Sequence, residues 1–375
     1  MAYLEITGLP IGARSDEFGV SVGLELEKGR GLSVLSDDGA LPQELADAVT
    51  GRARFSGEVI LNGMRIDPMP PRKRAVAVLG EVPGVLPSRT VRENLELALR
   101  KRPTTVSEQV FLVDEELSDG MLAGLGDSRA GALDDAGRTI LAAARILLAG
   151  CDLLLIRRLP VPGFTRTGEE PSWRPGFHMD TLLELKSLLR RFRATWISLL
   201  TDPACVHVLS DRVAIFALGR MVQESSLREC LNAPASRMVA DFLTFPRMNY
   251  RIVKIERDGP FVMLRSGRYS FRVSEYIKRQ LVAREGENAV MGIRPEDLLI
   301  RAYETGDPTV MNLAKVMRVD AIPGALVARL DVEGDEWLAM TEPGRPVFTG
   351  QLIELRPDPD KVHVFSPSTG ANLLD

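Results

Sequence analysis

The chain has 375 residues, of which 45% are hydrophobic and 26% charged, and its formal net charge is −4. This composition is that of a folded globular protein with room for two or three domains. The acidic balance gives no support to a nucleic-acid partner, and the sequence has no run of about 18 uncharged apolar residues that would span a membrane. Cys151, Cys205 and Cys230 have neither pair nor metal spacing, which favours the reducing cytosol.

The first 80 residues predict strands with one helix between them. Residues 4–6 and 20–26 alternate apolar and polar side chains, which predicts an antiparallel strand pair. The apolar run 32–35 predicts a buried strand, 42–50 a helix that ends at Gly51, and 74–79 a further buried strand.

Helices and strands alternate from residue 90 to residue 217. Helices are expected over 90–99, 140–148 and 179–193, with a polar and broken helical stretch over 101–136. Strands are expected over 153–156, 195–200 and 213–217, and the last of these should end the sheet. Residues 160–177 are rich in Pro and Gly and predict a surface loop. This alternation is typical of an α/β domain with a mostly parallel sheet.

The sequence pattern changes after about residue 243. Short alternating segments are separated by Gly, Asp and Pro, at 262–264, 269–273, 289–293, 327–330 and 352–355. That pattern predicts a small β-barrel. We therefore expect two domains, 1–242 and 243–375, with the boundary within 242–248.

Residues 29–63 have the order of a nucleotide-binding start: a strand, a turn, a helix and the segment 56–63. A phosphate-binding loop at this turn would read G-x-x-x-x-G-K-[ST], with a lysine that neutralises phosphate charge. Here a proline replaces the lysine. The turn consists of Ser36, Asp37, Asp38, Gly39, Ala40, Leu41, Pro42 and Gln43, followed by Glu44.

Several segments resemble the cytoplasmic ATP-binding subunits of ABC importers of the maltose and glycerol-phosphate type. They are residues 56–63, 70–77, 90–95 and 210–214 in the first domain, and 292–297 and 362–370 in the second. The resemblance covers nearly the whole chain. It implies an α/β P-loop NTPase fold of the ABC cassette type, with a helical subdomain at about 87–145, and a C-terminal OB/TOBE-like β-barrel with a regulatory role.

The resemblance also assigns roles to the turn. It places Leu41 at the second glycine of the loop, Pro42 at the lysine and Gln43 at the Mg²⁺-binding hydroxyl. Carboxylates at 37, 38 and 44 would add negative charge beside the phosphates. A structural interpretation also fits, with Pro42 at the first helical position and Glu44 complementing the positive end of the helix. We expect no ordinary ATP binding at this turn.

In the family, the strand equivalent to 153–156 ends in an Asp that supports Mg²⁺ and a Glu that polarises the attacking water. Here Arg157 and Arg158 follow the strand. Two cations repel Mg²⁺ and cannot act as a general base. Two alternatives remain open: Arg157 supplies the positive charge missing at Pro42, or both arginines are solvated or pair with the carboxylates at 37, 38 or 44.

A signature segment of one family subunit covers the phosphate held by the opposite subunit. A tempting match at 117–121 lies too far upstream of the strand 153–156. The family spacing leads instead to a segment in which two carboxylates replace a serine and a glycine. That segment consists of Leu133, Asp134, Asp135, Ala136 and Gly137.

Three further family positions and one insertion also differ from the pattern of an active cassette subunit. Glu81 stands at the Q-loop glutamine and Thr201 at the switch histidine of the family. No adenine-stacking aromatic residue is evident near Ala13, although Phe18 is close to it. The loop 160–177 holds extra residues where the family's D-loop touches a partner subunit, so an altered dimer surface is expected.

The segment 87–100 resembles the groove of the family's helical subdomain that receives a cytoplasmic helix of the permease. The matching residues are Pro87, Thr90, Val91, Glu93 and Asn94. The sequence leaves two interpretations open. These residues contact a permease, or they pack the subdomain and do nothing else.

The resemblance and the replaced positions together predict a pseudo-ATPase subunit of a carbohydrate-type importer, which docks on the permease and pairs with an active cassette subunit. We expect no catalytic residue, no metal ligand and no required cofactor, so Mg²⁺ and ATP are not expected to bind. The expected partners are transmembrane permease subunits and a second cassette subunit, as homo- or heterodimer, at the cytoplasmic side of the cell membrane. A partner's own ATP site would still face Asp134 and Asp135.

Two alternatives are kept. A cytosolic regulatory or scaffold protein could sense a small ligand through its C-terminal barrel. A divergent active ATPase would need Arg157 and Phe18 to rescue nucleotide binding.

Overall fold

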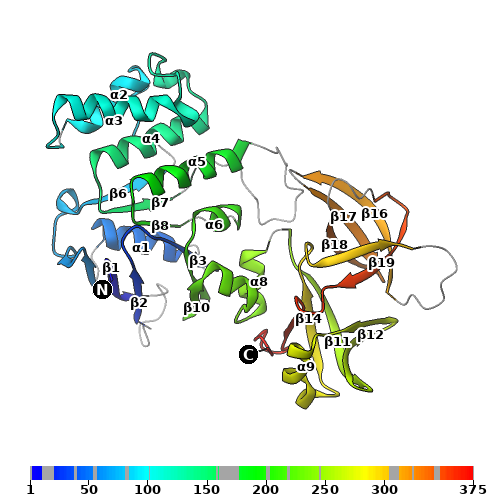
Figure 1. Ribbon diagram of the computed structural model, residues 1–375. Coiled ribbons are helices and arrows are strands. Elements are labelled where there is room, and N and C mark those ends of the chain that lie inside the picture. The colour runs from blue at the N-terminus through cyan, green and yellow to red at the C-terminus, as the bar shows by residue number, and fades with distance from the viewer. Residues whose placement is uncertain are drawn as a thin grey trace. The chain divides into compact units, whose positions relative to one another are not determined.

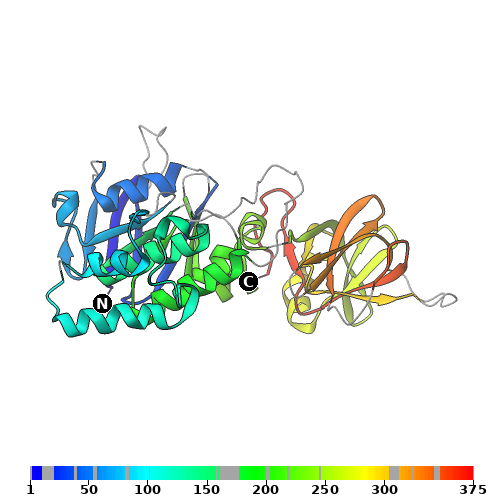
Figure 2. The same ribbon diagram turned by 90° about the horizontal axis from the view of Figure 1, so that it is seen from above.

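The computed structural model describes residues 2–10, 21–37, 40–53, 57–80, 84–100, 102–157, 159, 177–199, 203–217, 220–244, 246–303, 312–322, 325–341 and 347–374. The chain divides into two compact units, Met1–Leu227 and Arg228–Asp375 (Figure 1, Figure 2).

A six-stranded sheet in the order β10-β9-β3-β8-β7-β6 forms the centre of the first unit. Its parallel strands are β3 (Gly31–Ser36), β6 (Val76–Leu79), β7 (Leu153–Ile156), β8 (Trp196–Ser198) and β9 (Arg212–Ala217). Every residue of β3 and β7 is buried, as in parallel sheets that are covered on both faces. The expected parallel α/β sheet is confirmed. The expectation that the strand at 213–217 ends the sheet is wrong, because β10 (Arg220–Ser226) adds an antiparallel edge strand.

Helices cover both faces of this sheet (Figure 1). On one face, α1 (Ala40–Thr50) packs through Leu41 and Leu45 into a core cluster with Leu153 and Leu155. On the other face, α4 (Asp135–Ala149), α5 (Phe177–Arg191) and α6 (Pro203–Leu209) belong to a cluster with Ile156. Alternate residues of β7 enter the two clusters because successive side chains of a strand point to opposite faces.

A second, antiparallel sheet in the first unit has the order β2-β1-β4-β5. Its strands are β1 (Leu4–Pro10), β2 (Ser21–Leu26), β4 (Glu58–Leu61) and β5 (Met64–Arg65). The antiparallel pairing of Leu4 with Leu26 and Ile6 with Leu24 confirms the strand pair expected at the start of the chain. The short helix η1 (Pro71–Lys73) precedes β6.

The helical part of the first unit contains α2 (Val91–Leu99), α3 (Val106–Ser118) and the short helices η2 (Gly120–Leu122) and η3 (Ala130–Ala132), followed by α4. The helices expected over 90–99 and 179–193 are confirmed within two residues. Helix α4 begins at Asp135, five residues before the expected start at 140, because Asp134 caps it.

The second unit consists mainly of two five-stranded antiparallel sheets, β13-β12-β11-β14-β20 and β15-β19-β16-β17-β18. The first sheet contains β11 (Asn249–Asp258), β12 (Phe261–Ser266), β13 (Tyr269–Arg272), β14 (Asn288–Ile293) and β20 (His363–Phe365). The second contains β15 (Leu298–Ala302), β16 (Leu313–Ile322), β17 (Ala325–Val332), β18 (Asp335–Thr341) and β19 (Leu352–Pro357). Helices α9 (Glu275–Leu281) and η4 (Val282–Arg284) follow β13.

One hydrophobic core joins the two sheets, and it includes Tyr269, Phe271 and Trp337, whose rings stack in sequence at 6.1 and 6.2 Å. The edge strand β18 returns toward β15, since Met340 N donates to Pro295 O at 2.8 Å. The second sheet therefore curls into the barrel-like arrangement that the alternating sequence pattern predicts.

The compact units divide after Leu227, whereas the sequence pattern changes near residue 243. Helices α7 (Leu227–Asn232) and α8 (Arg237–Leu243) lie between these points. Arg237 N donates to Gly370 O at 2.8 Å, and Asn372 N donates to Ala235 O at 3.0 Å. These contacts join helices α7 and α8 to the end of the chain. Sequence periodicity cannot predict contacts between segments so far apart in the chain. Within the described ranges, no helix is both long enough and apolar enough to cross a membrane.

Candidate functional site

The turn between β3 and α1 is the first half of the candidate nucleotide site. Ser36 is buried at the end of β3, and Asp37 is exposed, with its N–H directed to Phe216 O at 3.3 Å. Ala40 begins α1, and Leu41 is only 2% exposed because its side chain packs in the core beneath the sheet. The position that the family alignment gives to a loop glycine therefore holds a core side chain. Asp38 and Gly39 lie outside the described residues.

Pro42 is the third residue of α1, not the first as expected. The first four N–H groups of a helix have no intrahelical acceptor, so a proline still fits there. Glu44 is the fifth residue, and the first turn of α1 contains no acidic side chain. The expected pairing of Glu44 with the positive helix end is therefore wrong, because that effect is confined to the first turn.

The side chains of Gln43 and Arg157 meet across this site. Arg157 follows β7, where its N–H donates to Leu79 O at 2.7 Å. Its Nη2 donates to Gln43 Oε1, and Gln43 Nε2 donates to Asp47 Oδ2 at 2.6 Å. The partner that the structure gives Arg157 is therefore a neutral amide, and not a carboxylate at 37 or 44 as one alternative proposed. Arg158 lies outside the described residues.

These side chains do not fit a magnesium nucleotide. Pro42 has no amine to neutralise phosphate charge, and Gln43 offers no hydroxyl to the metal. Arg157 places a permanent positive charge where the family places a carboxylate, and like charges repel. Among the residues that the structure describes, no group of three or more His, Cys, Asp or Glu side chains could hold a metal ion.

The second half of the candidate site is the start of α4. Asp134 is the N-cap of this helix, and its Oδ1 accepts a hydrogen bond from Gly137 N at 2.7 Å. Asp135 pairs with Arg138, whose guanidinium also donates to Leu133 O. A helix N-terminus can bind an anion through its N–H groups, but here the protein's own carboxylate occupies one of them.

The remaining residues of this segment are internal. Leu133 is 8% and Ala136 2% exposed, and Gly137 is also buried. A Cβ at Gly137 would lie 3.2 Å from Asp134 Oδ1 and 3.3 Å from Leu133 Cβ, so a larger residue there would press on the cap. Glu81 and Thr201, expected at the Q-loop and switch positions, lie outside the described residues, as do Ala13 and Phe18.

The five expected docking residues lie at the start of α2. Thr90 and Glu93 form a capping box: Glu93 N donates to Thr90 Oγ1 at 3.1 Å, and Thr90 N donates to Glu93 Oε2 at 2.9 Å. The hydrogen bond from Thr90 N is the main cause, and the one from Arg89 the next, that holds the pKa of Glu93 below its usual value. Val91 is fully buried. Pro87 is exposed, while its carbonyl accepts a hydrogen bond from Gly131 N at 3.0 Å.

Asn94 is also fully buried and holds the segment before α2 in place. Its side-chain amide donates to Leu86 O at 3.0 Å and to Thr90 O at 2.9 Å, and its Oδ1 accepts from Leu86 N at 2.9 Å. Thr90, Val91, Glu93 and Asn94 thus have structural roles within the subdomain, as the packing interpretation requires. The side chain of Pro87 remains accessible.

An apolar surface on α3 was not predicted. Val106, Val110 and Phe111 are 78%, 53% and 67% exposed. Val106 and Val110 are four residues apart and therefore lie next to each other on one face of the helix, and Phe111 lies about 100° further around it. The sequence did contain this signal, as an apolar stripe inside a stretch that we described as polar and broken. Asp114 and Glu115 are also exposed further along α3.

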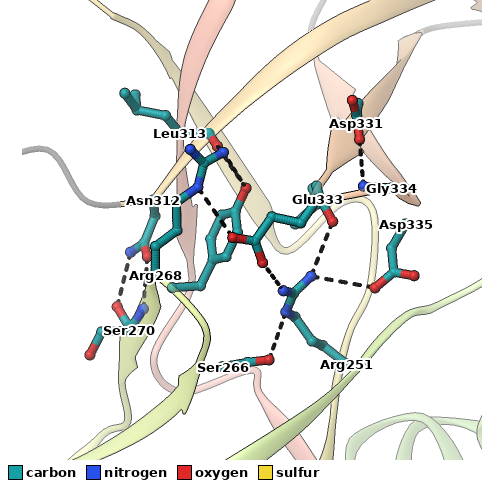
Figure 3. A network of polar contacts seen from close by, with 12 residues as sticks. Arg251, Ser266, Arg268, Ser270, Asn312, Leu313, Asp331, Glu333, Gly334 and Asp335 are labelled. Carbon is teal, nitrogen blue, oxygen red and sulfur yellow. Dashed lines mark hydrogen bonds and ion pairs between the residues drawn. The ribbon is translucent and has the colours of Figure 1, made fainter.

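The barrel was the other expected ligand site, and a polar network in it is internally bonded (Figure 3). Arg251 donates from Nε to Ser266 Oγ at 3.0 Å and from Nη1 to Val332 O at 3.1 Å. Its guanidinium also pairs with Glu333 and with Asp335, the latter at 3.4 Å. Glu333 adopts a positive φ of 54°, which is uncommon for a residue other than glycine.

The same network surrounds Tyr269. Its hydroxyl donates to Leu313 O at 2.7 Å, and the residue is fully buried. The guanidinium carbons of Arg251 and Arg268 lie 4.8 and 5.3 Å from the ring centroid, and Arg268 Nε lies 3.5 Å from Glu333 Oε1. These polar groups already have hydrogen-bond or ion-pair partners within the barrel. The network therefore stabilises the barrel itself.

No family model matches the chain. An sn-glycerol-3-phosphate import ATP-binding protein of Agrobacterium fabrum is 24% identical over 355 residues, which are 94% of this chain and 89% of the relative. A maltose/maltodextrin import ATP-binding protein of Yersinia pestis is 25% identical over 281 residues, 74% of this chain and 73% of the relative. A sulfoquinovosyl glycerol transport ATP-binding protein of Agrobacterium fabrum is 24% identical over 330 residues, 86% of this chain and 84% of the relative.

Among solved structures, a nucleotide-free ATP-binding cassette from an ABC transporter has 16% sequence identity and a TM-score of 0.47, and it covers 64% of this chain and 98% of that one.

The parallel sheet, the helical subdomain and the barrel-like second unit agree with the α/β cassette fold and the C-terminal β-barrel that the sequence resemblance implies. More specifically, the curated homologues of this chain are ATP-binding subunits of ABC importers for sugars and glycerol phosphate, at about 24% identity over most of its length.

Proposed function

We propose that this chain is a pseudo-ATPase: a cassette subunit of a carbohydrate-type ABC importer that neither binds Mg-ATP nor hydrolyses it. It docks on transmembrane permease subunits at the cytoplasmic side of the membrane and pairs with a second cassette subunit. The names of the homologues support the importer, because they are import proteins for glycerol phosphate, maltodextrins and a sulfosugar glycoside.

The observation that carries the loss of ATPase activity is the contact between Gln43 and Arg157. In the family these two positions support one Mg²⁺ ion, through a hydroxyl and a carboxylate. Here a neutral amide and a guanidinium bond to each other directly. The Mg²⁺ ion, the lysine and the general base supply most of the electrostatic stabilisation in phosphoryl transfer. Because all three are lost here, we expect no ATP turnover.

Docking on a permease is supported by accessible apolar side chains of the helical subdomain. Leu86 is 42% exposed, beside Pro87, and α3 adds Val106, Val110 and Phe111. Exposed apolar side chains that gather on one element are typical of interaction surfaces. Cytoplasmic loops of membrane proteins carry an excess of Lys and Arg, which the acidic side chains of α3 would complement.

ATP binding and turnover test the loss of activity. The purified chain should show no thermal shift with Mg-ATP up to millimolar concentration and no phosphate release. Pro42→Lys alone should restore neither, because Arg157 still repels the metal. A thermal shift at micromolar ATP, or turnover above that of buffer, would refute the pseudo-ATPase and favour the divergent active enzyme.

Docking requires a separate test. The tagged chain should co-purify from detergent-solubilised membranes of its own host with an identified permease subunit. Val110→Asp and Phe111→Asp together should abolish this, while Ser107→Ala, at a neutral exposed position near the start of the same helix, should not. Recovery of the chain without any permease would contradict the importer role.

A second candidate function is a cytosolic regulatory or scaffold protein. The self-capped start of α4 favours it, because a partner's phosphates would meet Asp134 there and not a free helix N-terminus. This protein would sense a small ligand through its second unit. A soluble chain that elutes free of permease but shifts its melting temperature with a sugar or sugar phosphate would support it.

A further inference from the structure

We propose that Arg157 is a built-in cation that replaces magnesium and, with Gln43, forms a permanent link between the end of β7 and the first turn of α1. This inference rests on the proposed pseudo-ATPase function. It adds that Arg157 and Gln43 hold together the two segments that a metal ion would join in the family. The link makes the conformation of this region independent of nucleotide.

Both ends of the link are fixed by the fold. Every residue of β7 is buried, and the Arg157 N–H is bound to Leu79 O at 2.7 Å. Leu41 and Leu45 are 2% and 0% exposed, which anchors the start of α1 on the sheet. Little additional backbone ordering is needed for the two side chains to meet.

The Gln43 amide is oriented by a second bond. Its Nε2 donates to Asp47 Oδ2 at 2.6 Å, one helical turn further along α1. A carboxylate can only accept, so the NH₂ group must face Asp47, and Oε1 is left to face Arg157. A guanidinium can only donate, so it matches this oxygen. The three side chains therefore form one chain of donors and acceptors, in which each group has a single consistent orientation.

The strand order shows why such a link has a structural effect. Strand β8 lies between β3, which leads into α1, and β7, which leads into Arg157. The link thus crosses a strand and joins segments that are 114 residues apart in the chain. A divalent cation could do the same only when bound, and binding stabilises a protein in proportion to the logarithm of the ligand concentration. A guanidinium remains charged at all physiological pH values and does not dissociate.

Amide hydrogen exchange of the full-length chain tests the link. In Arg157→Ala and in Gln43→Ala, peptides from residues 40–53 should exchange about fivefold faster than in wild type, the effect of losing one exposed charge-assisted bond. The double variant should be no faster than Gln43→Ala alone, because that variant already lacks the contact with Arg157 as well as the bond to Asp47. Arg72→Ala is the matched control, since Arg72 is exposed on η1 and has no side-chain bond to any other described residue.

Addition of MgCl₂ alone, or of Mg-ATP, should leave exchange over residues 40–53 of the wild type unchanged. Unchanged exchange in both single variants, or additive effects in the double variant, would overturn the link and leave the pseudo-ATPase proposal intact. Protection of the wild type by Mg-ATP would instead overturn both proposals, so the two failures are distinguishable.

Discussion

At the scale of single residues, Asn94 separates a docking role from a packing role. It is fully buried and makes three hydrogen bonds to the backbone of Leu86 and Thr90. A side chain with no accessible surface cannot contact a partner directly. Its contribution to docking would be to hold Leu86 and Pro87 in position.

Replacement of Asn94 by Ala should lower the stability of the first unit by about 2 kcal/mol, because the N–H and C=O groups of Leu86 lose their partners. Urea unfolding checks this. Glu96→Ala on the exposed side of α2 is the control and should change stability by less than about 0.5 kcal/mol. Equal effects of the two substitutions would contradict the packing role of Asn94.

His363 is a residue whose burial has a consequence for pH dependence. It is 5% exposed, and burial, followed by repulsion from Arg294 and Lys361, lowers its pKa from 6.5 to about 3. The unfolded chain therefore binds a proton between about pH 6.5 and pH 3 that the folded chain does not. The stabilising contribution is complete above pH 6.5 and is lost as the pH falls toward 3.

We expect the second unit to lose up to about 1.4 kcal/mol per pH unit from this residue below pH 6. Urea-dependent hydrogen exchange of peptides from β14 and β20, measured at several pH values, gives the slope. His363→Gln should flatten that slope, whatever it does to stability at pH 7. His207→Gln, in the first unit, should leave it in place. An identical slope in wild type and His363→Gln would show that another group titrates.

At the scale of elements, the start of α4 shows how one side chain can cap a helix and occupy a backbone donor that could otherwise bind an anion. Asp134 bonds to Gly137 N, and the helix begins directly after it. Asp is among the best N-cap residues because its carboxylate accepts from the free N–H groups of the first turn. The same bond takes a donor that an anion would otherwise use.

Asp134→Ala should cost about 1 kcal/mol and lower the melting temperature of the first unit by about 2–4 °C. Asp134→Ser should remain within a few tenths of a kcal/mol of wild type because serine also caps. The neighbouring control is Asp135→Ala, which removes an exposed ion pair and a first-turn carboxylate but no hydrogen bond to the helix N–H groups, and should cost less. A calorimetric scan in which Ala and Ser at residue 134 are equally stable would contradict the capping role.

At the scale of the whole molecule, helices α7 and α8 lie on the second unit's side of the division between the two compact units. Tyr250 Oη donates to Asp241 Oδ1 at 2.6 Å, and Ala240 packs in a small cluster with Val290 and Phe365. A fragment that begins at residue 243 would expose these two apolar side chains and lose the hydrogen bond.

A fragment of residues 228–375 should therefore melt at least about 10 °C above one of residues 243–375, as expected for a loss of a few kcal/mol of apolar burial. Circular dichroism of both fragments checks this. Equal melting temperatures would place the structural boundary near residue 243, where the sequence pattern changes.

The sequence predicted the strands of the parallel sheet, without the edge strand β10, and the β-rich character of the second unit. Continuous apolar runs predicted the buried strands, and alternating segments predicted the barrel, since both depend on local periodicity. The sequence also shows that Pro42 replaces a lysine and that Arg157 replaces a carboxylate of the family, because residue identity is enough to see this. The resemblance to importer subunits follows from the same residues, and the curated homologues agree with it.

Tertiary structure decided what the replaced residues do. The sequence left open whether Arg157 replaces the charge missing at Pro42 or is solvated or paired with carboxylates, whereas the fold gives it the amide of a residue 114 positions earlier. The tertiary structure also shows that Asp134 bonds to its own helix and that the Asn94 side chain is inaccessible to a partner. These outcomes depend on which side chains meet after folding, and contacts between distant residues leave no periodic trace in the sequence.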